Sequence, residues 1–135
     1  MMPSPNLDLV RSIYAAWERR NYRSAEWAHS EIEYVNADGP DRGRRVGLEE
    51  MAEAWRRHLS SWLEFHTTAE EYVELDDDRV LVLVAFGGTP RFIGLDITDA
   101  PSKGANVFEI KDGKVRKLIL YWDRAHALAD LWLEE

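Results

Sequence analysis

The chain has 135 residues, 45% of them hydrophobic, which is enough for one domain to bury a core without disulfides or a structural metal. It contains no cysteine, which excludes a disulfide framework and a thiolate metal site; because it also has no apolar N-terminal run, we expect a cytoplasmic protein. The formal net charge of −8 repels phosphate backbones and anionic lipids, so we expect neither nucleic acid nor a membrane as a partner.

The first predicted element is a helix that follows Ser4, a good N-cap residue, with Pro5 at the first helical position. We expect this helix to end near Asn21. Its apolar residues recur at helical spacing and form one stripe: Leu7, Val10, Tyr14 and Trp17.

A second, shorter helix is predicted from Ser24, carrying Trp27. A strand is then predicted over 31–36, because side chains alternate between two faces there. One face of that strand carries Ile32, Tyr34 and Asn36. The following segment, 38–43, has nearly pure turn chemistry.

Gly47 opens the longest predicted helix, with acidic residues in its first turn and basic residues late, as the helix dipole favours. One face of it carries Leu48, Met51, Trp55, Leu59 and Trp62. Strands are predicted over 64–75 and 79–86. The second of these is apolar on both faces, so we expect a central strand that is covered on each side.

Residues 87–90 predict a kink or loop, and a strand is expected over 91–98. A β-hairpin follows around Asp112-Gly113, which supplies the positive-φ residues of a tight turn. Asp123 then caps a last helix, whose inward residues are predicted to be Leu128, Leu131 and Trp132.

The register of this hairpin is open between two alternatives. A two-residue loop puts Asn106 on the face of Ile119 and Tyr121, whereas a three-residue loop with a bulge puts it on the opposite face of the second strand. That opposite face carries Leu118, Leu120 and Trp122.

Helices that precede a run of hairpin-linked strands are typical of the α+β class. We therefore expect a single domain over residues 1–135, shaped as a cone-like α+β barrel. In it, three N-terminal helices pack on a strongly curved, mostly antiparallel sheet, and a short helix ends the chain.

Several segments carry a resemblance to a known family. The stretches DDRVLVLVAF and NVFEIKDGKVRKLILYWDRAHAL are similar to the C-terminal half of the nuclear-transport-factor-2-like superfamily, in particular its SnoaL-like and ketosteroid-isomerase-like members. The segments IYAAW and IEY and the pattern G-x-x-x-M-x-x-x-W fit the N-terminal half. The resemblance covers nearly the whole chain and implies a homodimer that pairs through the open face of the sheet. It implies no single activity, because the superfamily includes isomerases, cyclases, dehydratases, epoxide hydrolases and non-catalytic binding subunits.

The ketosteroid isomerases imply three candidate catalytic residues. Their base is a carboxylate on the first strand, where this chain has Tyr34, a poor base at neutral pH. Asp38 is the candidate base if its turn folds back over the cavity, and otherwise an ordinary turn aspartate. Asn106 falls at the position of the acid that stabilises the oxyanion in those enzymes; the alternative is that its side chain only satisfies nearby backbone groups. Tyr14 is the candidate for a second hydrogen-bond donor, and the alternative is that it is a core residue.

Other chemistries of the superfamily fit less well. The water-activating triad of its epoxide hydrolases is not matched, because Leu81 and Leu120 stand at two of its positions. The four histidines fall on different predicted elements, so we expect no metal and no cofactor. Among them, His66 is the one we expect to reach a pocket.

The chain contains six tryptophans, five tyrosines and four phenylalanines, whose rings need a core, a pocket or an interface. We expect an aromatic pocket for a flat hydrophobic, steroid- or polyketide-like molecule, lined by Trp17, Trp27, Tyr34, Asn36, Trp55, His66, Leu120 and Trp122. The alternative is a non-catalytic dimerisation module whose cone is filled by these rings. A pocket of at least ~300 Å³ favours the first hypothesis, and a collapsed cone the second.

Overall fold

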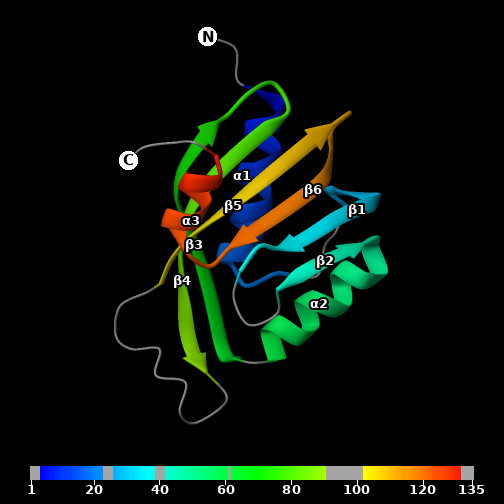
Figure 1. Ribbon diagram of the computed structural model, residues 1–135. Helices are drawn as coiled ribbons and strands as arrows, with labels where there is room; N and C mark the ends of the chain where they lie inside the picture. The colour runs from blue at the N-terminus through cyan, green and yellow to red at the C-terminus, as the bar shows by residue number, and fades with distance from the viewer. Residues whose placement is uncertain (1–3, 23–25, 39–41, 61, 91–101, 132–135) are drawn as a thin grey trace.

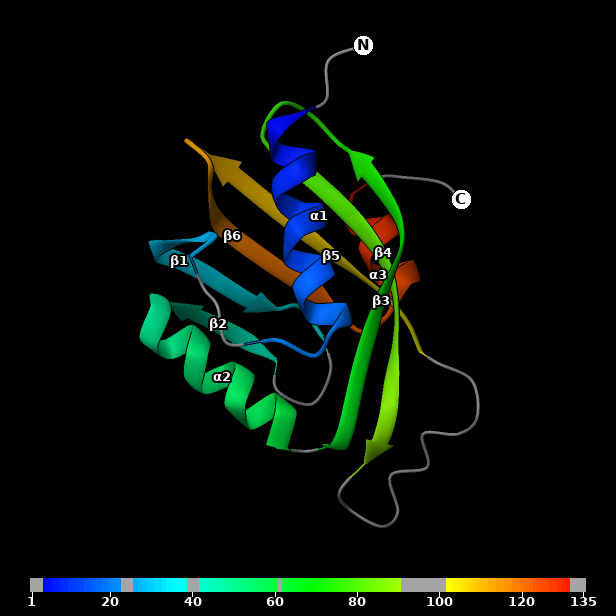
Figure 2. The same cartoon turned by 180° about the vertical axis from the view of Figure 1, so that it is seen from behind.

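Six strands form one bent sheet, with two helices on its inner face and one on its outer face (Figure 1; Figure 2). The computed structural model describes residues 4–22, 26–38, 42–60, 62–90 and 102–131. The helices are α1 (Pro5–Glu18), α2 (Leu48–Ser60) and α3 (Arg124–Asp130). The strands are β1 (Ala28–Asn36), β2 (Gly43–Val46), β3 (Trp62–Glu74), β4 (Arg79–Pro90), β5 (Ser102–Lys111) and β6 (Lys114–Tyr121).

The strand order is β2-β1-β6-β5-β4-β3, and the sheet does not close into a full barrel. All neighbouring strands are antiparallel except β1 and β6, which run parallel. The predicted fold class, a cone of helices on a strongly curved and mostly antiparallel sheet, is therefore confirmed.

Two apolar clusters lie on opposite faces of the sheet. The inner cluster joins α1 and α2 to the sheet and includes the fully buried Tyr14, Tyr34 and Phe108. The outer cluster lies under α3 and includes Leu81 and Val107. Because β4 contributes to both clusters, the prediction of a strand covered on each side is confirmed.

The helix caps follow the sequence signals. The Ser4 hydroxyl accepts a hydrogen bond from the Leu7 N–H at the start of α1, with Pro5 in the first turn. The Asp123 carboxylate accepts from the Ala125 N–H at the start of α3. Among the described residues, no helix is long and apolar enough to cross a membrane.

The hairpin between β5 and β6 combines a two-residue turn with a bulge. Asp112 and Gly113 both have positive φ, 54° and 77°, and Lys111 pairs with Lys114 directly across them. A register shift then places Arg116 as an extra residue, so that Asn106 pairs with Leu120. The second predicted register is therefore observed, although the bulge lies in β6 and not in a longer loop.

Three segments differ from the prediction. The second N-terminal helix is wrong where it can be compared, because residues 26 and 27 form a turn and Ala28 begins β1; residues 23–25 lie outside the described part. Residues 43–46 form the short edge strand β2, which the predicted turn over 38–43 overlaps only at Gly43 and which was otherwise not predicted. Residues 87–90 continue β4, since their backbone pairs with β3. The strand predicted over 91–98 and the side chains of Trp62 and Trp132 lie outside the described residues.

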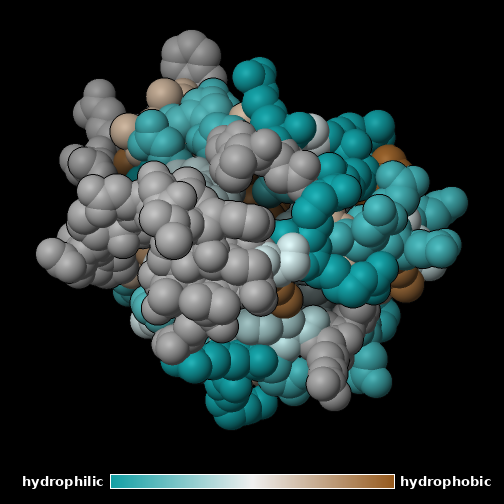
Figure 3. Space-filling view, turned by 90° about the horizontal axis from the view of Figure 1, so that it is seen from below, coloured by the Kyte–Doolittle hydropathy of each residue, from teal (hydrophilic) through white to brown (hydrophobic). Residues whose placement is uncertain are grey.

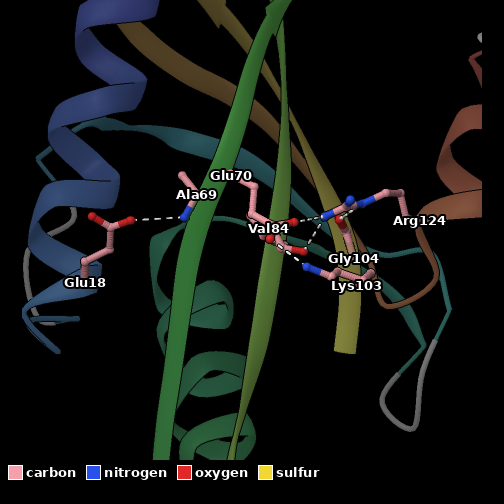
Figure 4. A network of polar contacts seen from close by, with 7 residues as sticks. All are labelled: Glu18, Ala69, Glu70, Val84, Lys103, Gly104 and Arg124. Atoms are coloured by element: carbon pink, nitrogen blue, oxygen red, sulfur yellow. Dashed lines mark hydrogen bonds and ion pairs between the residues drawn. The ribbon is translucent and has the colours of Figure 1, made fainter. Parts of the chain in front are cut away.

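Polar contacts on the outer face and edge hold the bend of the sheet (Figure 4). A register shift around Glu70 interrupts the edge strand β3, and the Ala69 N–H donates to the Glu18 carboxylate at 3.0 Å. The guanidinium of Arg124 donates to the carbonyls of Val84 and Gly104, at 2.9 and 3.2 Å. The arginine of α3 thereby joins β4 to β5.

The described surface is mainly hydrophilic at the lower end of the molecule, with small hydrophobic areas between the polar side chains (Figure 3). Large hydrophobic side chains that are exposed among the described residues are Val46 and Leu48, at 40% and 36%. Val46 ends the edge strand β2, and Leu48 begins α2 two residues later. The apolar residues that the structure describes therefore lie mostly inside the fold.

Candidate functional site

A pocket opens between the two inner helices and the concave face of the sheet. It encloses a cavity of about 50 Å³. The residues that line it come from α1, α2 and strands β3 to β6: Trp17, Trp55, His58, Phe65, Thr67, Val84, Phe86, Asn106, Leu120, Tyr121 and Trp122. This volume is smaller than the ~300 Å³ typical of a ligand pocket, because aromatic rings fill most of the cone.

The walls are built from rings that meet edge to face. The Trp122 ring lies 5.1 Å from that of Phe86 and 5.8 Å from that of His58, nearly perpendicular to both. The Trp17 and Trp55 rings lie 5.2 Å apart on the helical side. Such contacts stabilise the walls without stacking them into one layer, so that a gap stays between the helices and the sheet.

Asn106, on β5, brings a buried amide to this apolar lining. Its side chain is 7% exposed, and its Nδ2 donates a hydrogen bond to the Tyr14 hydroxyl of α1. An amide nitrogen carries two hydrogens, so this bond leaves the second one for another acceptor. Thr67 and His58 bring further polar groups to the same pocket.

Tyr14 stands behind Asn106 and is fully buried. Burial raises the pKa of its phenol far above the ordinary value, because the charged form would lose its hydration, and the bond from Asn106 offsets this only in part. Tyr14 is therefore neutral at all ordinary pH values. It can hold the Asn106 amide in place, but it cannot act as a base.

The structure brings five of the predicted site residues together around the pocket: Trp17, Trp55, Asn106, Leu120 and Trp122. Tyr34 lies in the core, 1% exposed, and Asn36 is buried in β1 opposite Leu120, yet neither lines the pocket. His66 is exposed, because it alternates with the pocket residues Phe65 and Thr67 along β3. Its predicted place in the pocket is therefore not observed.

Trp27 lies at a different cavity of about 310 Å³, between α1 and the β5–β6 turn. That cavity has both apolar and polar walls, which include Ile13, Glu26 and Lys114. The Trp27 and Trp17 rings are 6.0 Å apart, so Trp17 separates the two cavities.

Asp38 follows β1, and its carboxylate is turned to the end of β6 and to α3. Its Oδ1 accepts from the Trp122 N–H at 2.5 Å, and its Oδ2 lies 2.7 Å from His126 Nδ1. Asp38 is not among the described residues that line the pocket. The turn after β1 therefore contacts the backbone of the lining residue Trp122 and does not reach the cavity itself.

The sequence reasoning missed several lining residues, of which His58 matters most chemically. It follows Trp55 by three positions in α2 and therefore shares its face, a spacing that was available in the sequence. Alternation along two strands could also have found Phe65 with Thr67 and Val84 with Phe86. Among the described residues, no group of three histidine, aspartate or glutamate side chains is placed to hold a metal ion.

Residues 7–131 match the family model of the SnoaL-like polyketide cyclases. No curated protein matches the chain. Among solved structures, the fold is similar to that of a nuclear-transport-factor-2-like protein of unknown function from Burkholderia pseudomallei. The TM-score is 0.74 and the sequence identity 20%, over 94% of this chain and 97% of that one.

Two further solved structures were obtained with small molecules. TerC, co-crystallised with polyporic acid, has a TM-score of 0.72 and 21% identity, over 95% of this chain and 98% of that one. A protein of ketosteroid-isomerase-like fold from Catenulispora acidiphila, in complex with trimethylamine, has a TM-score of 0.68 and 16% identity over 94% of each chain. At these identities the likeness concerns the fold alone.

Proposed function

Because the chain belongs to the SnoaL-like polyketide cyclase family, we propose that it binds a flat, mostly apolar molecule in the aromatic pocket and acts on it as an isomerase or cyclase. The ligand is steroid- or polyketide-like and carries a carbonyl or hydroxyl oxygen. One observation supports this above the others: the buried Asn106 amide lies in a mostly apolar wall, backed by Tyr14. A few polar groups in an apolar pocket orient a ligand without adding much affinity of their own.

The proposed chemistry is proton transfer beside a carbonyl. Asn106 donates its second N–H to the carbonyl oxygen and stabilises the enolate that forms when the neighbouring carbon loses a proton. The described lining has two titratable side chains, His58 and Tyr121. Because the Tyr121 phenol stays neutral, His58 accepts that proton and returns it to another carbon. Asp38 is the second candidate base, but only if its carboxylate leaves Trp122 and His126.

Ligand binding in this proposal requires the pocket to widen. The cavity of about 50 Å³ is too small for a polycyclic molecule while all rings keep their places. Trp55 and Trp122 are only half-buried, so they can move outward with less loss of packing than the fully buried Tyr14. The same small volume favours the second candidate function, a non-catalytic module with a filled cone.

Matched ligands separate the two functions. Titration with 1-tetralone and with tetralin, which lacks the oxygen, is measured by tryptophan fluorescence. One hydrogen bond contributes about 1 kcal/mol, so we expect tetralone to bind about five-fold more tightly than tetralin and this preference to vanish in Asn106→Leu. If neither compound binds, the filled-cone module is the correct function.

Proton transfer is tested by exchange of the α-hydrogens of 1-tetralone in D₂O, followed by NMR. We expect His58→Gln to lose the protein-dependent exchange, with Asn106→Leu slowing it. His66→Gln is the matched control, because His66 is exposed on the other face of β3. Loss of exchange in Asp38→Asn with normal exchange in His58→Gln would transfer the role of base to Asp38.

The homodimer expected from the family resemblance is also part of the proposal. It uses the outer face of the sheet, where β6 and β4 carry the half-buried Ile119 and Leu83 beside α3. Sedimentation of the protein measures this directly, and a monomer at micromolar concentration contradicts it.

A further inference from the structure

Two consecutive residues of the pocket wall, Tyr121 and Trp122, are attached to a polar cluster on the outer side of the sheet. The Asp38 carboxylate accepts from the backbone N–H of Trp122 at 2.5 Å through Oδ1. Its other oxygen, Oδ2, lies 2.7 Å from Nδ1 of His126. One carboxylate therefore bridges the wall and helix α3.

Trp122 stands at the point where β6 ends, just after Tyr121. Up to that point the parallel pairing with β1 holds the strand, and the last such contact runs from the Ala37 N–H to the Leu120 carbonyl at 2.9 Å. Beyond it, the Asp38 side chain continues the connection. Since the Trp122 ring packs on Phe86 and His58, a shift of its backbone moves the pocket wall.

His126 lies among anionic groups. From its own helix, Asp130 Oδ2 is 3.4 Å from His126 Nε2, and the N-cap Asp123 adds negative charge. From β6, the Tyr121 ring meets the imidazole edge to face at 5.1 Å, and its hydroxyl donates to the same Asp130 oxygen at 3.1 Å. Burial, with the bond to Asp130 adding to it, raises the pKa of Tyr121 to about 12, so this phenol stays neutral.

The nearby cations do not offset these charges. Arg124, in the same helix, is turned to Glu70 at 2.6 Å, and Lys103 of β5 lies 2.6 Å from the other oxygen of that carboxylate. The hydrogen bond with Asp38 is the main cause that raises the pKa of His126 above its ordinary value. A charged imidazolium also donates a stronger hydrogen bond than neutral imidazole does.

We propose that Asp38 is a positioning residue: together with His126 it holds Trp122 in the pocket wall, tightly while His126 is protonated and more loosely once it is neutral. Asp38 then acts on the ligand through Trp122 and not as the base. The inference rests on the proposed function only in that the wall belongs to a binding pocket.

The direction of the pH dependence follows from the raised pKa. The protonated form is favoured in the folded protein, so the extra hold is fully present below the ordinary histidine pKa of 6.5 and is lost as pH rises through the raised value. The Trp122 side of the pocket should therefore loosen as pH rises through this raised pKa, while the rest of the pocket keeps its structure.

The test follows the backbone amide of Trp122 by NMR in ¹⁵N-labelled protein between pH 5 and 9. We expect its proton resonance to move upfield as pH rises, with the same midpoint as the His126 ring protons. His126→Gln, which keeps a neutral donor, should abolish this transition, and Asp38→Asn should shift the resonance at every pH. His66→Gln, the matched exposed histidine, should leave the titration unchanged.

A Trp122 amide that does not titrate in the wild-type protein, or that titrates unchanged in His126→Gln, overturns the proposal. The wild-type titration alone decides this if a variant fails to fold. The experiment needs no ligand, so absence of tetralone binding counts against the proposed function and leaves this result intact. Where tetralone binds, its dissociation rate should rise with pH in the wild type and stay flat in His126→Gln.

Discussion

The two faces of the sheet are stabilised by different kinds of contact. The inner face consists of interlocking rings and one buried amide–phenol pair, Asn106 with Tyr14. The outer face adds ionic contacts to a smaller apolar cluster, among them Arg124 with Glu70. The inner face should therefore respond to changes of volume and to unsatisfied hydrogen bonds, and the outer face to charge and pH.

The largest effect is expected at Gly104, a residue of β5 that has close neighbours. A Cβ there would lie 2.5 Å from the Tyr121 carbonyl oxygen and 2.9 Å from the Phe86 ring. Since the first of these is backbone, Gly104→Ala should lower the free energy of unfolding by about 3 kcal/mol. Urea denaturation measures the change, and the exposed neighbour Lys103→Ala serves as control. A loss below about 1 kcal/mol would show that the strand can move aside.

Tyr14→Phe comes next and concerns the inner face alone. Removing the hydroxyl deprives the buried Asn106 amide of its partner, which should lower the free energy of unfolding by about 2 kcal/mol. A double-mutant cycle with Asn106→Leu sharpens this, because the second change removes the group left without its partner. The double variant should be at least as stable as Tyr14→Phe alone. Simple addition of the two losses would contradict the pairing.

Arg124 tests the outer face. Its guanidinium serves two backbone carbonyls and a carboxylate at once, a geometry that an ammonium cannot reproduce. We expect Arg124→Lys to lower the free energy of unfolding by about 1.5 kcal/mol. Lys103→Ala should lower it by less than about 0.5 kcal/mol, because the Lys103–Glu70 pair is largely exposed. Little or no loss in Arg124→Lys would mean that the charge, and not the forked geometry, matters.

The smallest effect is the acid response of Glu70. Its hydrogen bonds with Arg124 and then Lys103 lower the pKa of this carboxyl group. Its contribution to stability is present above the unfolded value of about 4.5 and is lost as pH falls through the lowered folded value. Melting temperatures of wild type and Glu70→Gln should therefore differ at pH 7 and converge as pH falls through this lowered pKa. Glu53→Gln, exposed on α2, should show no such convergence.

Local signals in the sequence were enough to predict most of the fold. Three kinds of signal depend only on residues close together in the sequence, and each was observed: the helix caps at Ser4 and Asp123, the Asp112-Gly113 turn, and the strand before residue 87 that is apolar on both faces. The edge strand β2 could not be predicted in this way. The sequence Gly-Arg-Arg-Val shows no alternation of apolar and polar residues, and only its pairing with β1 identifies it as a strand.

The candidate site was only partly predictable, for a related reason. Asn106 and Trp122 could be placed in one cavity because hairpin register relates them. The partner of Asp38 could not be predicted, because its contact with His126 joins a turn to a helix end 88 positions further along the chain. The filling of the pocket depends on how rings from α1, α2 and the sheet pack together, which no single segment determines.

The bulge at Arg116 gives the hairpin a way to change the pocket without any substitution in it. Before the bulge Val115 faces inward, and after it the even-numbered residues Leu118 and Leu120 do. One residue inserted beside Arg116, with the bulge kept, would turn Ile119 toward Asn106 and carry Leu120 to the outside. Because Arg116 is exposed, the inserted residue itself meets no packing constraint, but the fully buried Leu118 would turn outward with Leu120, so the insertion would change the inner wall at a cost in packing.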